Sequence, residues 1–240
     1  METFQQYVNE QFIGKDPNRT DVGRDIFKAL KENWIEKIGY IPTKPMAIIK
    51  VTEKDSPIIK SLGFSEPDDL LLDNFGVMMS SCINTGADVQ RNVVDYTGVV
   101  RTMHFQENGN INMAFATYQR PPPFFPGVDL SLGGYLRVGS GVTPPARSDF
   151  QIETPMIIPP MTGFLNVGIP YWIEANQEAV VQTLITPALI AGDINECGLY
   201  SLMRLGSSNS SVIIMMSHDA ATASFNEGDH IEMSYTWSLS

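Results

Sequence analysis

The chain has 240 residues, a formal net charge of −11 and a pI near 4.6. This acidic balance argues against nucleic-acid binding, because a surface that follows phosphates needs clustered lysines and arginines. The N-terminus, METFQQYVNEQF, lacks the basic region and apolar run of a secretory signal, and apolar runs such as VIIMM are too short to span a bilayer. We therefore expect a soluble protein with no nucleic-acid partner and no membrane insertion.

Residues 1–45 are predicted to form an N-terminal helical segment. The first apolar residues are spaced by four, which predicts a short helix that ends near Gly14. A second set recurs at helical spacing from Val22 and predicts a longer helix that ends at Gly39. The apolar residues of the two helices are Phe4, Val8 and Phe12, then Val22, Ile26, Phe27, Leu30, Trp34, Ile35 and Ile38. We expect both apolar faces to pack on the body of the protein, although a helical arm docked on a neighbouring subunit has the same pattern.

Residues 46–119 are predicted to be a mixed region. Its first segment, MAIIKV, is typical of a strand. Ser56 and Pro57 can open a short helix through Leu62, which Gly63 would end. RNVVDY, GVVRTMHF and INMAFATY follow as strand candidates, because they are rich in β-branched and aromatic residues. Asn108 and Gly109 lie between the last two and predict a tight hairpin turn there.

Residues 120–133 are predicted to be a proline-rich connection that begins with RPPPFFPG. The prolines remove backbone donors and stiffen the chain, which fits a linker between two sheets or an extended arm lying on a partner. A solvated linker does not normally carry adjacent aromatic residues. Phe124 and Phe125 are therefore candidates for packing within this subunit or against another one.

Residues 134–240 are predicted to form a β-sandwich module. EAVVQTLIT and SVIIMMSH are strand candidates, separated by clusters of Gly, Pro, Asn and Ser. In IEMSYTWSL apolar and polar residues alternate, which is typical of a strand with one buried face. Strands about ten residues apart with such turns favour a mainly β fold, an antiparallel β-sandwich or jelly roll, behind the N-terminal helical segment.

The two cysteines, Cys82 and Cys197, are far apart in the sequence and outside any CxxC pattern. They indicate neither a disulfide framework nor a zinc knuckle. Two buried thiols are the simpler interpretation, and a single disulfide between them is the alternative.

The three histidines, His104, His218 and His230, lie in or beside predicted strands. His218 adjoins Asp219 and His230 follows Asp229, so a metal or acid/base cluster could form if the two strand ends met in space. Neighbouring residues on a strand point to opposite faces, however, and no HxH or HExxH spacing occurs. We therefore expect each Asp to cap a turn beside an exposed His.

Two groups of acidic residues could gather around calcium. They are Asp68, Asp69 and Asp73 in one segment and Asp193 with Glu196 in another. Neither has the alternating spacing, central Gly and terminal Glu of a calcium loop, so we expect solvated side chains. VGSGV lacks the Lys and Ser/Thr of a phosphate-binding loop, and no GxSxG elbow occurs. We expect no metal, no cofactor and no catalytic residue.

Residues 134–240 resemble a recurrent C-terminal module in structural proteins of tailed bacterial and archaeal viruses. The shared pattern is a glycine-rich turn, a Ser-Asp segment followed by Ile-Glu, an Ile-x-Glu-x-Gly-Leu segment, a Met-x-Arg and a closing alternating strand. Its residues here are Gly139, Gly141, Ser148, Asp149, Ile152, Glu153, Ile194, Glu196, Gly198, Leu199, Met203, Arg204 and residues 231–239. The chain departs from the pattern at Cys197 and at the proline pairs that begin at Pro144 and Pro159.

The resemblance implies a virion component such as a decoration, turret, neck or tail protein, which forms rings or trimers and binds other virion proteins. We expect it to be non-enzymatic, to be made in the host cytoplasm and to reside in the virion. Asp149, Glu153, Glu196 and Arg204 could form a polar network that fixes the turn and orients the strands. Gly198 would allow a tight backbone approach.

Four aromatic residues, Phe124, Phe125, Tyr171 and Trp172, are candidate anchors for interfaces with copies of the chain or with capsid or tail proteins. A second hypothesis is a receptor- or glycan-binding virion protein, in which exposed Trp and Tyr stack on sugars. A third is a polysaccharide-cleaving enzyme, which needs two carboxylates about 5 to 9.5 Å apart in one cleft.

Overall fold

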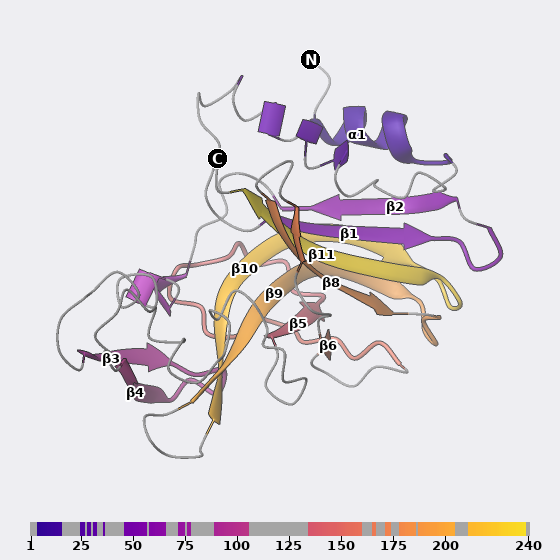
Figure 1. Ribbon diagram of the computed structural model, residues 1–240. Coiled ribbons are helices and arrows are strands. Elements are labelled where there is room, and N and C mark those ends of the chain that lie inside the picture. The colour runs from indigo at the N-terminus through magenta and orange to yellow at the C-terminus, as the bar shows by residue number, and fades with distance from the viewer. Residues whose placement is uncertain are drawn as a thin grey trace.

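The computed structural model is mainly β, with antiparallel sheets arranged as a sandwich and a short helix near the N-terminus (Figure 1). This confirms the predicted fold class. The structure describes residues 4–15, 25–26, 28–29, 31–32, 36, 46–56, 58–65, 72–74, 76–77, 89–105, 134–159, 165–166, 171–173, 178–185, 187–204 and 211–238.

The larger sheet has the strand order β2-β1-β11-β8-β7, and its neighbouring strands are antiparallel. Its strands are β1 Met46–Thr52, β2 Ile59–Phe64, β7 Tyr171–Ile173, β8 Glu178–Ile185 and β11 His230–Ser238. The strands predicted at MAIIKV, EAVVQTLIT and IEMSYTWSL are confirmed as β1, β8 and β11. Ile231, Met233 and Tyr235 of β11 are buried, as the alternating pattern predicts.

The second sheet has the order β10-β9-β5-β6 and is also antiparallel. Its strands are β5 Gly134–Gly139, β6 Leu165–Asn166, β9 Gly192–Arg204 and β10 Ser211–Phe225. The predicted strand SVIIMMSH is confirmed as the first half of β10. Two shifts of register interrupt the pairing of β9 with β10, and they decide which β10 side chains face the core.

The main hydrophobic core lies between the two sheets. Its residues are Ala47, Ile49, Val51, Leu136, Val138, Ile158, Ala188, Ile194, Cys197, Leu199, Ala221, Ala223, Phe225, Ile231, Met233 and Tyr235. Met46 pairs with Thr236, so residues 46–64 share one sheet with the C-terminal strands. The sandwich is therefore built from segments that lie far apart in the sequence.

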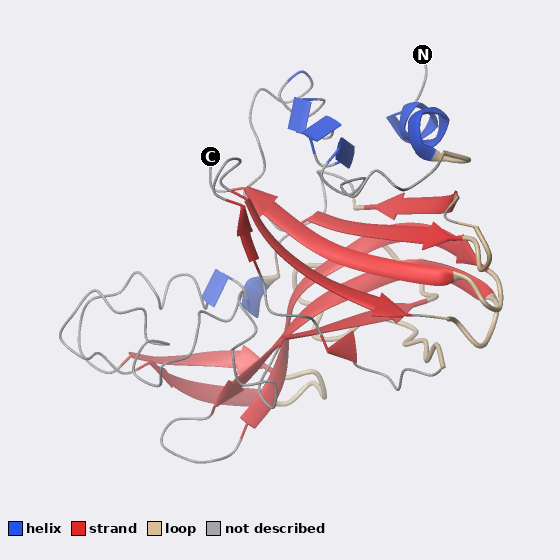
Figure 2. Cartoon of the chain, turned by 45° about the vertical axis from the view of Figure 1, so that its right-hand side comes forward, coloured by secondary structure: helices blue, strands red, loops and turns tan. Residues whose placement is uncertain are grey.

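The predicted N-terminal helix is confirmed as α1, Phe4–Phe12. Figure 2 shows it on the outer side of the larger sheet, away from the second sheet. Val8, Phe12 and Ile26 are buried against β1 and β2 in a separate apolar cluster. Gly14 follows the helix with φ at 76°, and its amide donates to the carbonyl of Ile59 at 2.9 Å. Among residues 22–38 the structure describes seven, and all seven are helical.

The helix predicted from residue 56 to Gly63 is wrong, because this segment contains strand β2. Ile59 and Phe64 are buried and β2 pairs with β1, so tertiary contacts outweigh the Ser-Pro helix signal. Gly63 does not end a helix. A Cβ at this position would lie 2.5 Å from the carbonyl oxygen of Thr222, so the glycine lets β10 pass close to β2.

Strands β3, Val89–Val94, and β4, Val100–Phe105, form a small antiparallel hairpin. They coincide with the predicted strands RNVVDY and GVVRTMHF. The turn between them is held by Asp95, whose carboxylate accepts from the amides of Thr97 and Val99 and from Nε of Arg101 at 2.7 to 3.1 Å. The hairpin predicted at Asn108 and Gly109, the strand INMAFATY and the connection at 120–133 lie outside the described residues.

Candidate functional site

The segment that follows β5, residues 140–156, is named here the strap. It leaves the end of β5 and returns beside it, because Ser140 donates to the carbonyl of Thr154 at 3.0 Å and Met156 donates to that of Val138 at 2.8 Å. Between these points the strap covers β9 and β10 on the face away from the core. Ile152 of the strap is fully buried there.

Alternation along β9 explains this second face. Cys197 and Leu199 point into the core between the sheets, whereas Tyr200 points outward and packs with Ile152 and Met215. The hydroxyl of Tyr200 accepts a hydrogen bond from the amide of Ile152 at 3.0 Å. The strap is thus attached to the sheet by both an apolar contact and a backbone hydrogen bond.

Glu196 is the centre of the polar contacts beneath the strap. Its carboxylate accepts from the amide of Gly141 at 3.0 Å and from the amides of Glu153 and Thr154 at 2.7 Å. The residue is only 3% exposed, so these amides satisfy the buried charge directly. The fourth partner is His218, whose Nε2 lies 2.9 Å from Oε2. One side chain of β9 thereby holds both ends of the strap and a residue of β10.

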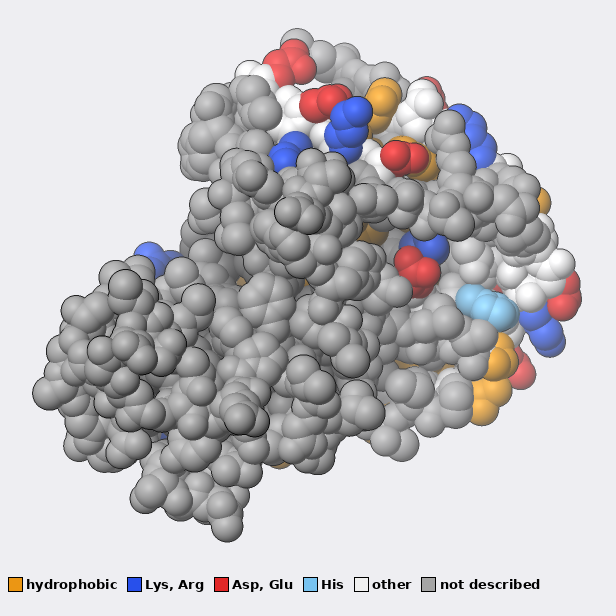
Figure 3. Space-filling view, in the orientation of Figure 1, with side chains coloured by type: hydrophobic (Ala, Val, Ile, Leu, Met, Phe, Trp, Pro, Cys, Tyr) orange, Lys and Arg blue, Asp and Glu red, His pale blue; other side chains and the backbone are white. Residues whose placement is uncertain are grey.

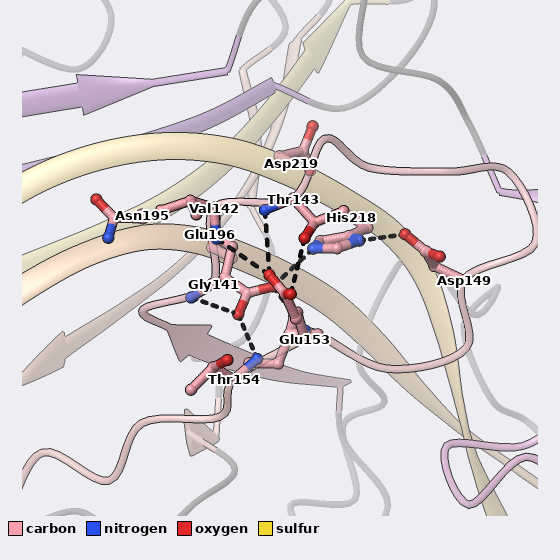
Figure 4. Close-up of polar contacts among 12 residues, drawn as sticks. Gly141, Val142, Thr143, Asp149, Glu153, Thr154, Asn195, Glu196, His218 and Asp219 are labelled. Atoms are coloured by element: carbon pink, nitrogen blue, oxygen red, sulfur yellow. Dashed lines mark hydrogen bonds and ion pairs between the residues drawn. The ribbon is translucent and has the colours of Figure 1, made fainter.

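His218 lies between two carboxylates (Figure 4). Its Nδ1 is 2.7 Å from Oδ2 of Asp149 in the strap, and its Nε2 contacts Glu196. The expectation of an exposed His beside a turn-capping Asp219 is wrong, because His218 is 3% exposed and faces the strap. Asp219 points to the opposite side, where it accepts from the hydroxyl of Tyr235 at 2.8 Å. The strand rule that separates neighbouring side chains holds here, but the strap buries the side chain that turns outward.

The electrostatics follow from these contacts. Burial alone would lower the pKa of His218, but the hydrogen bonds to Glu196 and Asp149 outweigh it and raise that pKa above its usual 6.5. Burial alone would raise the pKa of Glu196, but the bonds from His218 and the backbone amides lower it to about 2. The contacts therefore favour the protonated imidazole of His218 and the ionised carboxylate of Glu196.

Two further carboxylates stabilise the strap itself. Glu153 accepts from the amides of Val142 and Thr143 at 3.1 Å and from the Thr143 hydroxyl at 2.7 Å. The bonds from Thr143 are the main reason that the pKa of Glu153 is lowered. Asp149 accepts from the amide of Ala146 at 2.8 Å in addition to contacting His218. These bonds fix the backbone on both sides of the prolines in the turn.

The glycines of the turn make this packing possible. A Cβ on Gly139 would lie 2.5 Å from the carbonyl oxygen of Thr154, and one on Gly141 would lie 2.5 Å from Oε1 of Glu196. A Cβ on Gly198 would lie 2.9 Å from the ring of Tyr200 and 3.1 Å from the side chain of Ile152. The strap therefore approaches the sheet at points where only a glycine fits without a shift.

Among the predicted network residues, the structure brings Asp149, Glu153 and Glu196 together. Arg204 lies at the end of β9 opposite Ser211, and its side chain is outside the described residues. The cation within the network is His218, which sequence reasoning did not select. No local signal identifies it, because its partners lie 69 and 22 residues away.

The structure describes the candidate interface residues only in part. Phe124 and Phe125 lie outside the described residues. Tyr171 and Trp172 belong to β7, the edge strand that pairs with β8, and only their backbone is described. Cys197 is a buried thiol whose sulfur lies 3.5 Å from the Tyr235 hydroxyl, and Cys82 is outside the described residues.

Two of the acidic residues that were considered as calcium ligands have other partners. Asp73 is exposed and pairs with Arg147 at 3.3 Å, and Asp193 accepts from the hydroxyl of Ser224 at 2.5 Å. Among the residues that the structure describes, no group of three His, Cys, Asp or Glu side chains is arranged to hold a metal ion. A glycosidase acid needs a raised pKa, whereas the pKa values of Glu153 and Glu196 are both lowered.

A groove of about 660 Å³ lies between α1, β2 and β10. Its described lining is Asn9, Glu10, Ile13, Lys60, Ser61, Leu62, Thr222, Ala223 and Ser224. None of these side chains is aromatic, whereas the glycan hypothesis relies on exposed Trp and Tyr for stacking. Figure 3 shows acidic and basic side chains interspersed over the described part of one face.

Comparisons of the chain with protein-family models, with curated proteins and with solved structures found no match in any of the three. Within the described part of the chain, no helix is both long enough and apolar enough to cross a membrane.

Proposed function

We propose that the chain is a non-enzymatic building block of a virion, which self-associates and binds other capsid or tail proteins. The observation that carries the proposal is the hydrogen bonding of the ionisable groups in the strap and in the sheet beneath it. Glu153, Glu196 and His218 are each used in hydrogen bonds that hold the strap on the sheet. Such a fully bonded network is typical of a structural brace, because a catalytic group needs an acceptor or donor left for its substrate.

The strap also presents an apolar side chain on a fixed backbone. Val142 is 81% exposed, while its own amide and those of Gly141 and Thr143 are bound by Glu153 and Glu196. A preorganised apolar residue loses little conformational entropy on binding, which favours a protein interface. Ile157, which follows the strap, is also exposed. These residues support self-association through the strap.

The sequence pattern supports the particular setting. The residues that resemble virion structural proteins, such as Gly139, Gly141, Glu153 and Glu196, are those that build the strap and its contacts. Part of the pattern thus coincides with one structural feature, while its other residues, Met203, Arg204 and 231–238, lie on β9 and β11. A module whose pattern encodes a braced loop fits a protein that works through its contacts.

Sedimentation velocity of the purified chain tests this proposal. We expect species that are multiples of 26.6 kDa, and a complex when capsid or tail proteins of the same virus are added. Val142→Ser should shift the distribution toward the monomer, whereas Val100→Ser, also at an exposed position but on the β3–β4 hairpin, should not. A wild-type chain that stays monomeric and binds none of these proteins would overturn the proposal.

A further inference from the structure

The strap is joined to β10 by one histidine whose two ring nitrogens both face carboxylate oxygens. The distances are 2.7 Å from Nδ1 to Asp149 and 2.9 Å from Nε2 to Glu196. An ionised carboxylate can only accept a hydrogen bond, and those of Glu196 and Asp149 also accept from backbone amides. Both nitrogens must therefore donate, and an imidazole donates from both only when it carries the extra proton.

Loss of that proton makes one of the two contacts between the ring and a carboxylate repulsive. A neutral imidazole keeps one N–H, so its other nitrogen turns a lone pair toward a carboxylate oxygen at hydrogen-bond distance. Because His218 is almost completely buried, water cannot fill the gap without displacing the strap. The geometry thus couples the protonation of one side chain to the position of the strap.

The surrounding charges act in the same direction. Asp149 and Glu153 face this region from the strap, Glu196 from β9, and Arg137 from β5, in register with Gly198. Arg137 lies beside the hydroxyl of Tyr200 rather than between the histidine and its carboxylates. On β10 itself, Asp219 turns away into the core and bonds Tyr235. Negative charge therefore predominates at the ring and favours its protonated form.

We propose that Asp149, His218 and Glu196 form a proton-dependent latch that holds the strap closed on β9 and β10. With the latch protonated, Ile152 and Tyr200 stay covered. When His218 loses its proton, the strap loosens and uncovers this apolar face. The contacts that form the latch are independent of whether the chain belongs to a virion.

The pH range of the latch follows from the direction of the shifts. Folding raises the pKa of His218. Its contribution to the stability of the closed strap is therefore complete below pH 6.5, the ordinary pKa, and is lost as the pH rises through the folded pKa. On the acid side Glu196, with a pKa lowered to about 2, stays ionised through mildly acidic solution. The strap should be held in mildly acidic solution and should loosen as the pH rises through the folded pKa of His218.

Amide hydrogen exchange of the intact chain, corrected for the intrinsic rate at each pH, measures how readily the strap opens as the pH changes. We expect protection of the strap amides of Gly141 and Thr154 to fall on the order of tenfold or more as the pH rises through the folded pKa of His218. The paired amides of Ile49 in β1 should not change over the same range. The pKa itself is read from the imidazole ring protons by NMR.

Variants separate the latch from general stability. His218→Gln should remove the pH dependence of strap protection, and His230→Gln, at the first residue of β11, should keep it. If His218→Gln does not fold, Asp149→Asn decides, because this carboxylate is 27% exposed and its loss should move the pH midpoint downward. Wild-type protection that stays flat with pH, an unchanged profile in His218→Gln, or an unmoved midpoint in Asp149→Asn would each overturn the latch.

Discussion

Replacing Glu196 by Gln removes the charge at the centre of the network and keeps the shape of the side chain. The two carboxylate oxygens accept from the amides of Gly141, Glu153 and Thr154 and from His218 at 2.7 to 3.0 Å. Each carboxylate oxygen of Glu196 accepts from two of these donors. Gln keeps only one oxygen, and its NH₂ group takes the place of the other and cannot accept. At least one buried backbone amide then loses its partner.

The expected cost can be reached in two ways. Folding lowers the pKa of Glu196 from 4.5 to about 2, which corresponds to a stabilisation of the ionised carboxylate by about 3 kcal/mol. This is an upper bound, because water near the strap screens part of the interaction. Removing one partner of a buried charge pair costs about 3 to 5 kcal/mol. We therefore expect Glu196→Gln to lower the free energy of unfolding by about 2 to 4 kcal/mol, a large fraction of the stability of a single domain.

Urea unfolding at neutral pH, followed by circular dichroism, measures this loss. Glu232→Gln is the matched control, since Glu232 pairs with Lys50 at 3.0 Å on a partly exposed surface and should cost less than about 1 kcal/mol. The pKa of Glu196 is lowered by folding, so its contribution is present above 4.5 and should fade as the pH falls toward 2. A loss below about 1 kcal/mol at neutral pH would refute the central role of Glu196.

Two other substitutions test local features in the same unfolding assay. Gly139→Ala should cost at least about 2 kcal/mol, because its Cβ would meet Thr154, whereas Gly76→Ala, with open space around it, should be nearly neutral. Equal effects of the two would contradict the close approach of the strap. Asp95→Asn should cost about 1 kcal/mol by weakening the bond to partly exposed Arg101. The pKa of Asp95 is lowered to about 2, so its contribution exists above 3.8 and is lost as the pH falls through about 2; a cost that persists there would contradict this explanation.

Strands with one buried and one exposed face were predictable from local pattern. In β11 the alternation of Ile231, Met233 and Tyr235 with polar residues is sufficient, since a period of two leaves no other way to bury them together. The spacing by four in α1 is similarly sufficient. The segment at β2 was not predictable, because its Ser-Pro start and closing Gly63 fit a helix as well as they fit a strand.

The candidate site also has one part that the local sequence predicted and one part that it did not. Gly139, Gly141 and Glu153 lie in one continuous segment, and their turn-forming residue types indicated a fixed loop. The missing element was the cation. Arg204 was predicted from the resemblance pattern, whereas the structure puts His218 between the carboxylates because the register of β10 against β9 places it opposite Gly198.

The sequence by itself determined the fold class, the faces of its clearest strands and the turn at Gly139 and Gly141 that opens the strap. These properties depend on periodicity and residue type, which act over a few neighbouring residues. Only the tertiary structure decided that residues 46–64 join the C-terminal strands and that Asp149, Glu196 and His218 meet. The physical reason is register: pairing between distant strands selects which side chains share a face, and no local pattern specifies that pairing.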